Sequence, residues 1–215
     1  MSTQKMILAA LLVACTTSLT ALAADATTPA PKKYRAVIIQ GAGYLPGAKK
    51  PQGVDAITHA TTKVVNTYVL TDALVAKLTA LGVAVEVRQF NECKDLVCLD
   101  ASSSNAVKSA NLVIFAGPEH MGKPLKQLSV LYPKLKDIAI RNPGLVCTTL
   151  VSGGSKGKKS IAITDAAFKA AGVKFVPGMG LKSPGFFSKG ASTEEIDNAM
   201  TDFAARLVAA LPTAE

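Results

Sequence analysis

The most restrictive feature of this sequence is a series of apolar, strand-length runs that end in glycine-rich or polar turns. Tyr34–Gln40 (YRAVIIQ) is followed by Gly41, and a similar run covers 111–117 (NLVIFAG). Continuous apolar runs of this length are typical of parallel strands that are buried on both faces. Further strands are expected at 83–90, 145–151 and 173–176. The sequence therefore predicts a five-stranded parallel sheet.

Helical stretches separate these runs. The first spans about 62–81 and stops at Gly82, and a shorter one at 164–171 stops at Gly172. The last begins at Ser192, where Glu195 completes a capping box. Strands that alternate with helices imply an α/β three-layer sandwich with right-handed crossovers. The expected inner-face residues are Val65, Val69, Leu74, Leu78 and Leu81 in the first helix, and Ile196, Met200, Phe203, Leu207 and Leu211 in the last.

Residues 1–33 are expected to lie outside this domain. Lys5 precedes an apolar run at 6–14, and Ala21-Leu22-Ala23 fits a signal-peptidase site. We interpret 1–23 as a cleaved signal peptide, 24–33 as a flexible linker and 34–215 as the domain. A lipobox that ends in Cys15 is the alternative. The apolar run is too short for a membrane span, so the mature chain is expected in the periplasm or secreted, with no transmembrane segment.

The remaining cysteines fit an oxidising compartment. Cys93 and Cys98 flank a short polar turn, where export would allow them to close a small disulfide. No further Cys or His lies near them in the sequence to complete a set of zinc ligands, which argues against a zinc site. Cys147 lies in an apolar strand and is expected to be a buried free thiol. With two histidines in the chain, no metal site is expected.

The chain is basic, with a formal net charge of +9. Lysines pair at Lys32-Lys33, Lys49-Lys50 and Lys158-Lys159, but no aromatic residues are interleaved with them. Without aromatics, the pattern argues against a nucleic-acid surface. An anionic membrane, an acidic redox partner, a phosphorylated ligand or ordinary solvated lysines all remain open.

The segment 110–135 (ANLVIFAGPEHMGKPLKQLSVLYPKL) resembles the third strand, flavin loop and following helix of flavodoxins and related quinone reductases, with His120 where the family usually has Tyr. The segment 146–155 (VCTTLVSGGS) resembles their fourth strand and Gly-Gly turn. The resemblance implies a flavodoxin-like sheet of order 2-1-3-4-5 that binds FMN at the carboxyl ends of the strands. The implied ring contacts are Pro118, Glu119, His120, Met121, Gly122, Ser152, Gly153, Gly154 and Ser155.

The phosphate loop departs further from the family. Asn66-Thr67 resembles the family's Asn-Thr pair, but Val65 stands where the family has Gly, and 43–53 is inserted. Free N–H groups at a helix start are suited to a phosphate. The implied phosphate contacts are Thr58, Thr61, Thr62, Asn66 and Thr67.

The segment 55–61 (DAITHAT) also resembles a motif, Asp-x-x-Ser/Thr-Gly-Ala-Ser/Thr, that is recognised by extracytoplasmic flavin transferases. His59 replaces the Gly of that motif. The resemblance implies that FMN is attached to Thr61 through a phosphoester.

These features lead to two main hypotheses. The first is an exported FMN-binding protein in electron transfer or quinone reduction, with a membrane quinol or a cytochrome as its partner and an FMN-dependent oxidoreductase activity left open. The alternative is a flavodoxin-fold module that has lost the flavin and binds another ligand or partner. A Ser152–His120 hydrolase is a third, weaker idea, because the chain lacks a Gly-x-Ser-x-Gly elbow and an orienting acid.

Overall fold

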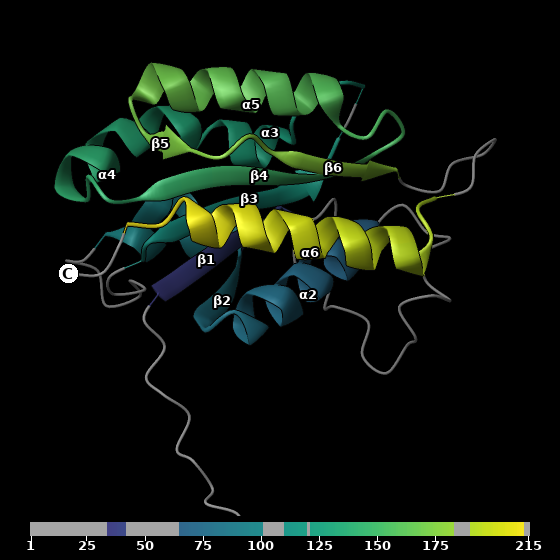
Figure 1. The fold of residues 1–215 in the computed structure, drawn as a ribbon. Coiled ribbons are helices and arrows are strands. Elements are labelled where there is room, and N and C mark those ends of the chain that lie inside the picture. Colours follow the sequence, from purple (N-terminus) through teal and green to yellow (C-terminus); the bar gives the residue numbers. More distant parts are fainter. Residues whose placement is uncertain (1–33, 42–64, 101–109, 120, 183–189, 213–215) are drawn as a thin grey trace, which may run out of the picture. The chain divides into compact units, whose positions relative to one another are not determined.

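A parallel β-sheet forms the centre of the domain and helices cover both of its faces (Figure 1). The computed structural model describes residues 34–41, 65–100, 110–119, 121–182 and 190–212. Its strands are β1 (Tyr34–Gln40), β2 (Val83–Gln89), β3 (Leu112–Pro118), β4 (Val146–Gly153), β5 (Lys174–Phe175) and β6 (Met179–Lys182). The order β2-β1-β3-β4-β5 is the predicted one, and every pairing is parallel.

The fifth strand position differs from the prediction, because two short strands fill it. Both β5 and β6 pair with β4, and the Pro177-Gly178 link separates them. Proline has no N–H to donate to a ladder. A Cβ at Gly178 would lie 2.3 Å from Cγ2 of Thr149, so the chain approaches β4 closely at this point. The sheet therefore has six strands in five positions.

Helices α2 (Val65–Ala80) and α6 (Thr193–Ala209) cover one face. Ser192 caps α6 as predicted: Glu195 N–H donates to its hydroxyl, and Ser192 N–H donates to the Glu195 carboxylate. On α2 the predicted stripe is partly wrong, because Leu81 lies beyond the helix and is 48% exposed. The buried residues of these two helices are Thr67, Tyr68, Leu70, Thr71, Leu74 and Leu78 on α2, and Met200, Phe203, Ala204 and Leu207 on α6.

The other face carries shorter elements and one long helix. These are η1 (Phe90–Leu99), α3 (Lys126–Ser129), η2 (Tyr132–Lys134), α4 (Leu135–Arg141) and α5 (Lys158–Ala171). Phe115 of β3, Tyr132 and Phe168 form a buried aromatic cluster with ring centroids 5.3 to 5.7 Å apart. Helix α5 starts earlier than the predicted 164, because Gly157 has a left-handed conformation (φ 66°) and starts the helix directly after the β4 turn.

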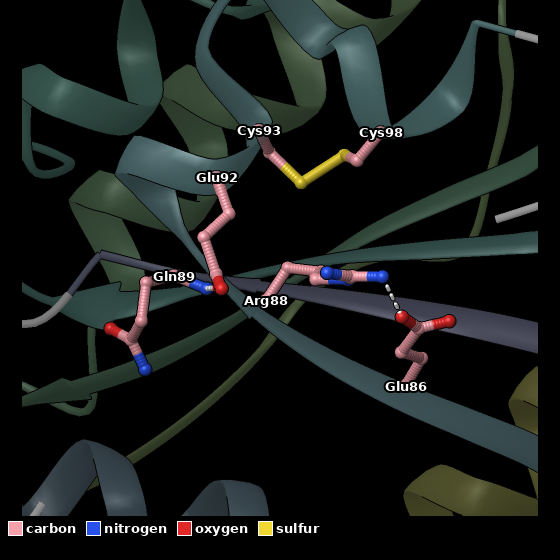
Figure 2. The surroundings of a disulfide bond; sticks show 6 residues. All are labelled: Glu86, Arg88, Gln89, Glu92, Cys93 and Cys98. Carbon is pink, nitrogen blue, oxygen red and sulfur yellow. Dashed lines mark hydrogen bonds and ion pairs between the residues drawn. A yellow bond between two sulfur atoms is a disulfide. The ribbon is translucent and has the colours of Figure 1, made fainter. Parts of the chain in front are cut away.

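A disulfide joins Cys93 and Cys98, a pairing that the sequence allowed but left open. Figure 2 shows it in η1, close to Arg88 and Glu86 of the edge strand β2. Both cysteines and Leu96 between them are fully buried, in the same core cluster as Val37 of β1. Cys147 is a buried free thiol, as expected.

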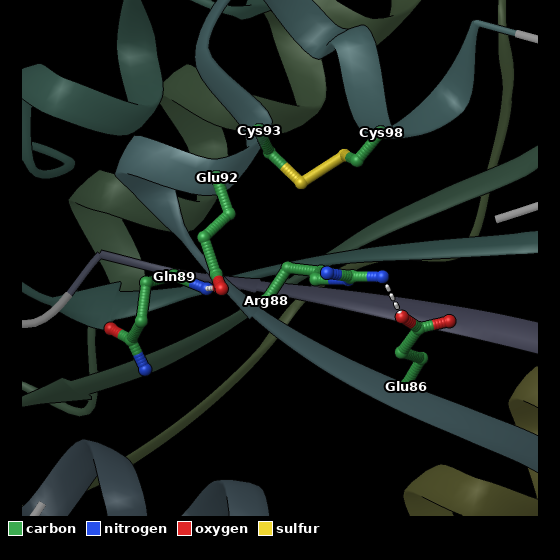
Figure 3. A network of polar contacts seen from close by, with 6 residues as sticks. All are labelled: Glu86, Arg88, Gln89, Glu92, Cys93 and Cys98. Atoms are coloured by element: carbon green, nitrogen blue, oxygen red, sulfur yellow. Dashed lines mark hydrogen bonds and ion pairs between the residues drawn. A yellow bond between two sulfur atoms is a disulfide. The ribbon is translucent and has the colours of Figure 1, made fainter. Parts of the chain in front are cut away.

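The edge strand β2 carries a charged pair beside this disulfide. The ion pair between Arg88 and Glu86 is drawn in Figure 3. Charged side chains on an edge strand disfavour pairing with another sheet. The Gln89 N–H donates to the Glu92 carboxylate at the start of η1 (2.6 Å), which fixes the exit from the strand.

All of these elements belong to one compact unit, Lys32–Glu215. The predicted signal peptide and linker lie outside the described residues. Within the described ranges, none of the helices has both the length and the apolar character that crossing a membrane requires.

Candidate functional site

The carboxyl ends of the strands meet at one edge of the sheet, where the predicted loops begin (Figure 1). Pro118 at the end of β3 pairs with Ser152 of β4, and Gly153 pairs with Lys182 of β6. Gly41, which follows β1, donates its N–H to the Ala116 carbonyl (2.9 Å). The ends of β1, β3, β4 and β6 therefore lie next to one another.

Glu119 joins the two loops that were predicted to surround a flavin ring. Its N–H donates to the Ser152 carbonyl at 2.8 Å. Its two carboxylate oxygens accept from the Ser155 hydroxyl at 2.9 and 3.1 Å. A Cβ at Gly153 would lie 2.8 Å from Cβ of Glu119 and 2.9 Å from Oε2, so the absence of a side chain there allows this contact. The structure thus brings together Glu119, Ser152, Gly153 and Ser155.

Met121 and Gly122 form the tip of the loop after β3. Both have left-handed backbone conformations, with φ values of 49° and 76°. Such a conformation is uncommon for a residue with a long side chain and is found more often at functional sites. Met121 is 89% exposed, so its soft thioether is presented to solvent at the predicted ring loop.

Thr67 and Ser152 have a role that the sequence did not predict. Their hydroxyls share a 2.7 Å hydrogen bond between α2 and β4, and both residues are buried. The predicted phosphate residue and the predicted ring-loop residue are therefore partners of each other. This pairing ties the start of α2 to the end of β4.

Gln40, the last residue of β1, is a buried polar residue that sequence reasoning missed. It is 1% exposed, and its Nε2 has no hydrogen-bond partner among the described residues. Ala36 and Ile38, which share its strand face, pack in the α2 core cluster. An unpaired buried donor costs about 1–3 kcal/mol, so such a group is suited to receive an acceptor oxygen from a ligand. The sequence feature that could have identified it is a polar Gln at the end of an otherwise apolar strand.

Several predicted contacts lie outside the described residues: Thr58, Thr61, Thr62 and His120. Asn66 belongs to the first turn of α2, but its side chain is not among those that the structure describes. The first turn of α2 holds no acidic residue. The first N–H groups of a helix have no partner within it. The start of α2 therefore offers backbone donors with no carboxylate in that turn to repel an anion.

The buried side chains of Tyr132 and Cys147 stay protonated at neutral pH. Burial raises the pKa of each to about 12. Ser152 is paired with Thr67 and is almost completely buried, which argues against a role as a hydrolytic nucleophile. In the described parts of the chain, no three His, Cys, Asp or Glu side chains are grouped as metal ligands.

Comparisons with known proteins identify the fold. No protein-family model matches the chain, and no curated protein sequence matches it significantly. A flavodoxin from Streptococcus pneumoniae TIGR4 has a TM-score of 0.51 and 18% identity, over 82% of this chain and 97% of the flavodoxin.

Two larger proteins contain the same fold. Rubredoxin oxygen:oxidoreductase from Desulfovibrio gigas has a TM-score of 0.55 and 14% identity, over 82% of this chain and 35% of that protein. RosB, solved with bound 8-demethyl-8-formylriboflavin-5'-phosphate, has a TM-score of 0.53 and 12% identity, over 82% of this chain and 78% of RosB. Together with the strand order, these similarities show that the chain has the flavodoxin-like fold.

Proposed function

We propose that this protein binds FMN at the carboxyl edge of its sheet and acts as a redox protein, in electron transfer or quinone reduction. The observation that carries the proposal is the junction of two loops, Glu119–Gly122 and Ser152–Ser155, on a sheet of flavodoxin order. In open α/β sheets, ligands bind at the carboxyl ends of the strands near the switch in strand order.

The described residues fit both ends of this cofactor. Around the ring, Gly154 leaves open space, with no atom within 4 Å of where a Cβ would stand, and Met121 supplies an exposed apolar group. Around the phosphate, the backbone at the start of α2 and the unpaired Gln40 amide supply donors. When bound, FMN supplies the one- and two-electron redox chemistry.

The proposed phosphate contacts include the Gln40 side chain, which was not predicted from the sequence. Thr67 is engaged with Ser152, so its contribution to the phosphate is through its backbone. Thr58, Thr61, Thr62 and Asn66 remain the proposed side-chain contacts, with Pro118 and His120 beside the ring.

We place the protein outside the cytoplasm, in the periplasm or secreted. The buried Cys93–Cys98 disulfide supports this, because disulfides persist in oxidising compartments. The proposed partner is a membrane quinol or a cytochrome. A covalent bond from FMN to Thr61 would retain the cofactor against dilution there, and the likeness of 55–61 to the flavin-transferase motif supports it.

The proposal is tested by titrating refolded protein with FMN and following quenching of flavin fluorescence. Riboflavin, which has the ring without the phosphate, is the matched control ligand. We expect saturable binding of FMN and at least about tenfold weaker binding of riboflavin, because the backbone donors and Gln40 engage the phosphate. No binding of either ligand by correctly folded protein would contradict the noncovalent part of the proposal.

The covalent part has a separate measurement. Protein from its native source is digested, and the peptide that contains Thr61 is weighed. A gain of one FMN less one water, lost in Thr61→Ala and kept in Thr62→Ala, is the expected result. An unmodified Thr61 peptide from the native source contradicts attachment.

A second candidate function is a binding module that has lost the flavin. Val65 in place of Gly and the engagement of Thr67 by Ser152 favour it, since both change the usual phosphate loop. The absence of both FMN binding and the Thr61 adduct would establish this candidate over the first.

A further inference from the structure

Five exposed lysines follow the carboxyl ends of β3 and β4, and we propose that they form a docking surface for an acidic protein. We call this set the basic rim: Lys123, Lys126, Lys156, Lys158 and Lys159. The basic rim is defined by charges of the protein itself and does not require a bound flavin.

The two segments of the basic rim lie against each other. A Cβ at Gly122 would lie 3.2 Å from Cδ of Lys159, so the loop after β3 contacts the first turn of α5. Ser155, next to Lys156, donates its hydroxyl to Glu119. The two segments that carry the lysines are therefore neighbours in space.

The positive charges of the basic rim are not neutralised internally. None of the five lysines forms an ion pair with a described residue, whereas Lys134 pairs with Asp95 and Lys77 pairs with Asp197. The sequence between Glu119 and Asp137, and again between Ser152 and Asp165, contains no acidic residue. The start of α5 adds the positive end of a helix dipole. This part of the surface thus has an unbalanced positive field.

Negative charge gathers on the other face of the sheet. Helix α6 carries Glu194, Glu195, Asp197 and Asp202 against one basic residue, Arg206. Figure 1 shows α5 and α6 on opposite faces of the sheet. A separation of charge like this orients a charged partner during its approach and raises the association rate. The charges favour one orientation, with the basic rim toward an acidic partner.

An apolar residue beside the lysines favours a protein as the occupant. Met121, two residues before Lys123 in the sequence, is the most exposed large apolar side chain in the described structure. Methionine is enriched at the centre of protein interfaces, and charged residues surround that centre. The described rim has no exposed aromatic side chain, which single-stranded nucleic acids and amphipathic membrane helices use. An acidic protein surface matches both the charge and the single apolar contact.

The experiment measures binding to poly-L-glutamate, a soluble acidic polypeptide, at low and physiological salt. The test variant is Lys123→Gln/Lys158→Gln/Lys159→Gln. The control is Lys136→Gln/Lys169→Gln/Lys174→Gln, which removes the same charge from exposed positions on α4, the last turn of α5 and β5. Figure 1 places α4 and β5 away from the strand tips. A Lys→Arg version of the test variant keeps the charge.

We expect the test variant to bind poly-L-glutamate about tenfold more weakly, while the control and the Arg version change less than about twofold. Equal losses in the test and control variants would overturn the proposal, because net charge alone would explain them. Tighter binding to phosphatidylglycerol vesicles or to an oligothymidylate than to poly-L-glutamate, with the same dependence on the rim, would replace it with a membrane or a nucleic-acid surface.

Discussion

Gly153 is the last residue of β4 and Gly154 is the first residue after it, and their surroundings differ. A Cβ at Gly153 would meet the Glu119 side chain at 2.8 Å, whereas a Cβ at Gly154 would meet nothing within 4 Å. The first glycine is therefore required by packing inside the protein. The second faces open space. From the sequence the two glycines were equivalent, because the neighbour that distinguishes them comes from another strand.

The substitution Gly153→Ala is expected to lower the free energy of unfolding by about 1–3 kcal/mol, because Glu119 must move. Gly154→Ala is the matched control and is expected to change it by less than about 0.5 kcal/mol. Urea denaturation measures both. Equal effects of the two substitutions would mean that Glu119 does not pack on Gly153.

The hydrogen bond between Thr67 and Ser152 is the second test at this scale. Thr67→Val and Ser152→Ala each remove one partner of a buried pair. A double-mutant cycle is expected to give a coupling of about 1 kcal/mol in the free energy of unfolding. Thr201→Val, which removes an exposed hydroxyl on α6, is the control. Zero coupling would show that the two hydroxyls are not partners.

At the scale of elements, sequence periodicity was sufficient where an element is buried or strongly capped. The strands β1, β3 and β4 and the start of α6 fall within two residues of their predicted positions, because continuous apolar runs and a capping box are local signals. The β5–β6 break was not predicted, since it depends on how closely Gly178 approaches Thr149 of another strand. The inner face of α2 was partly misassigned, because polar Thr67 and Thr71 occupy it.

The η1 segment depends on its disulfide. Cys93→Ser/Cys98→Ser is expected to lower the free energy of unfolding by about 2 kcal/mol from loop-closure entropy, with a further loss from burying two hydroxyls. Thermal unfolding is followed with and without reductant. Reductant should destabilise the wild type and leave the double variant unchanged. An unaffected wild type would contradict a stabilising disulfide.

Asp165 on α5, which accepts a hydrogen bond from the Gly178 backbone in the β5–β6 link, is expected to make the stability of the fold depend on pH. Burial raises the pKa of its carboxyl above the usual range, while a hydrogen bond from the Gly178 backbone opposes the shift. A carboxyl with a raised folded pKa holds its proton more tightly in the folded protein. Its stabilising effect is complete below the unfolded pKa and is lost as the pH rises through the folded pKa.

Replacing this carboxyl with an amide tests the pH dependence. Asp165→Asn is expected to raise the melting temperature at neutral pH, and this gain should shrink as the solution is acidified toward pH 3. Asp202→Asn, at an exposed position on α6, is the control. A difference that does not change with pH would rule out the carboxyl as its origin.

For the whole molecule, the fold could be predicted from the sequence, whereas the contacts at the carboxyl ends of the strands could be predicted only in part. The strand order followed from the resemblance and is confirmed by the pairing of the strands. The joining of the loops after β3 and β4 was also expected. The Thr67–Ser152 bond and the unpaired Gln40 amide were not, because each depends on contacts between residues distant in the sequence. The composition likewise predicted a basic chain. It did not predict that positive charge gathers at the start of α5 and negative charge on α6.

The visible absorption spectrum of protein purified from its native source tests most directly whether the protein binds FMN. We expect the two absorption bands of an oxidised flavin, which bleach on reduction with dithionite and remain after gel filtration. Correctly folded native protein without visible absorption, and without recovery of these bands after FMN is added, would contradict FMN binding.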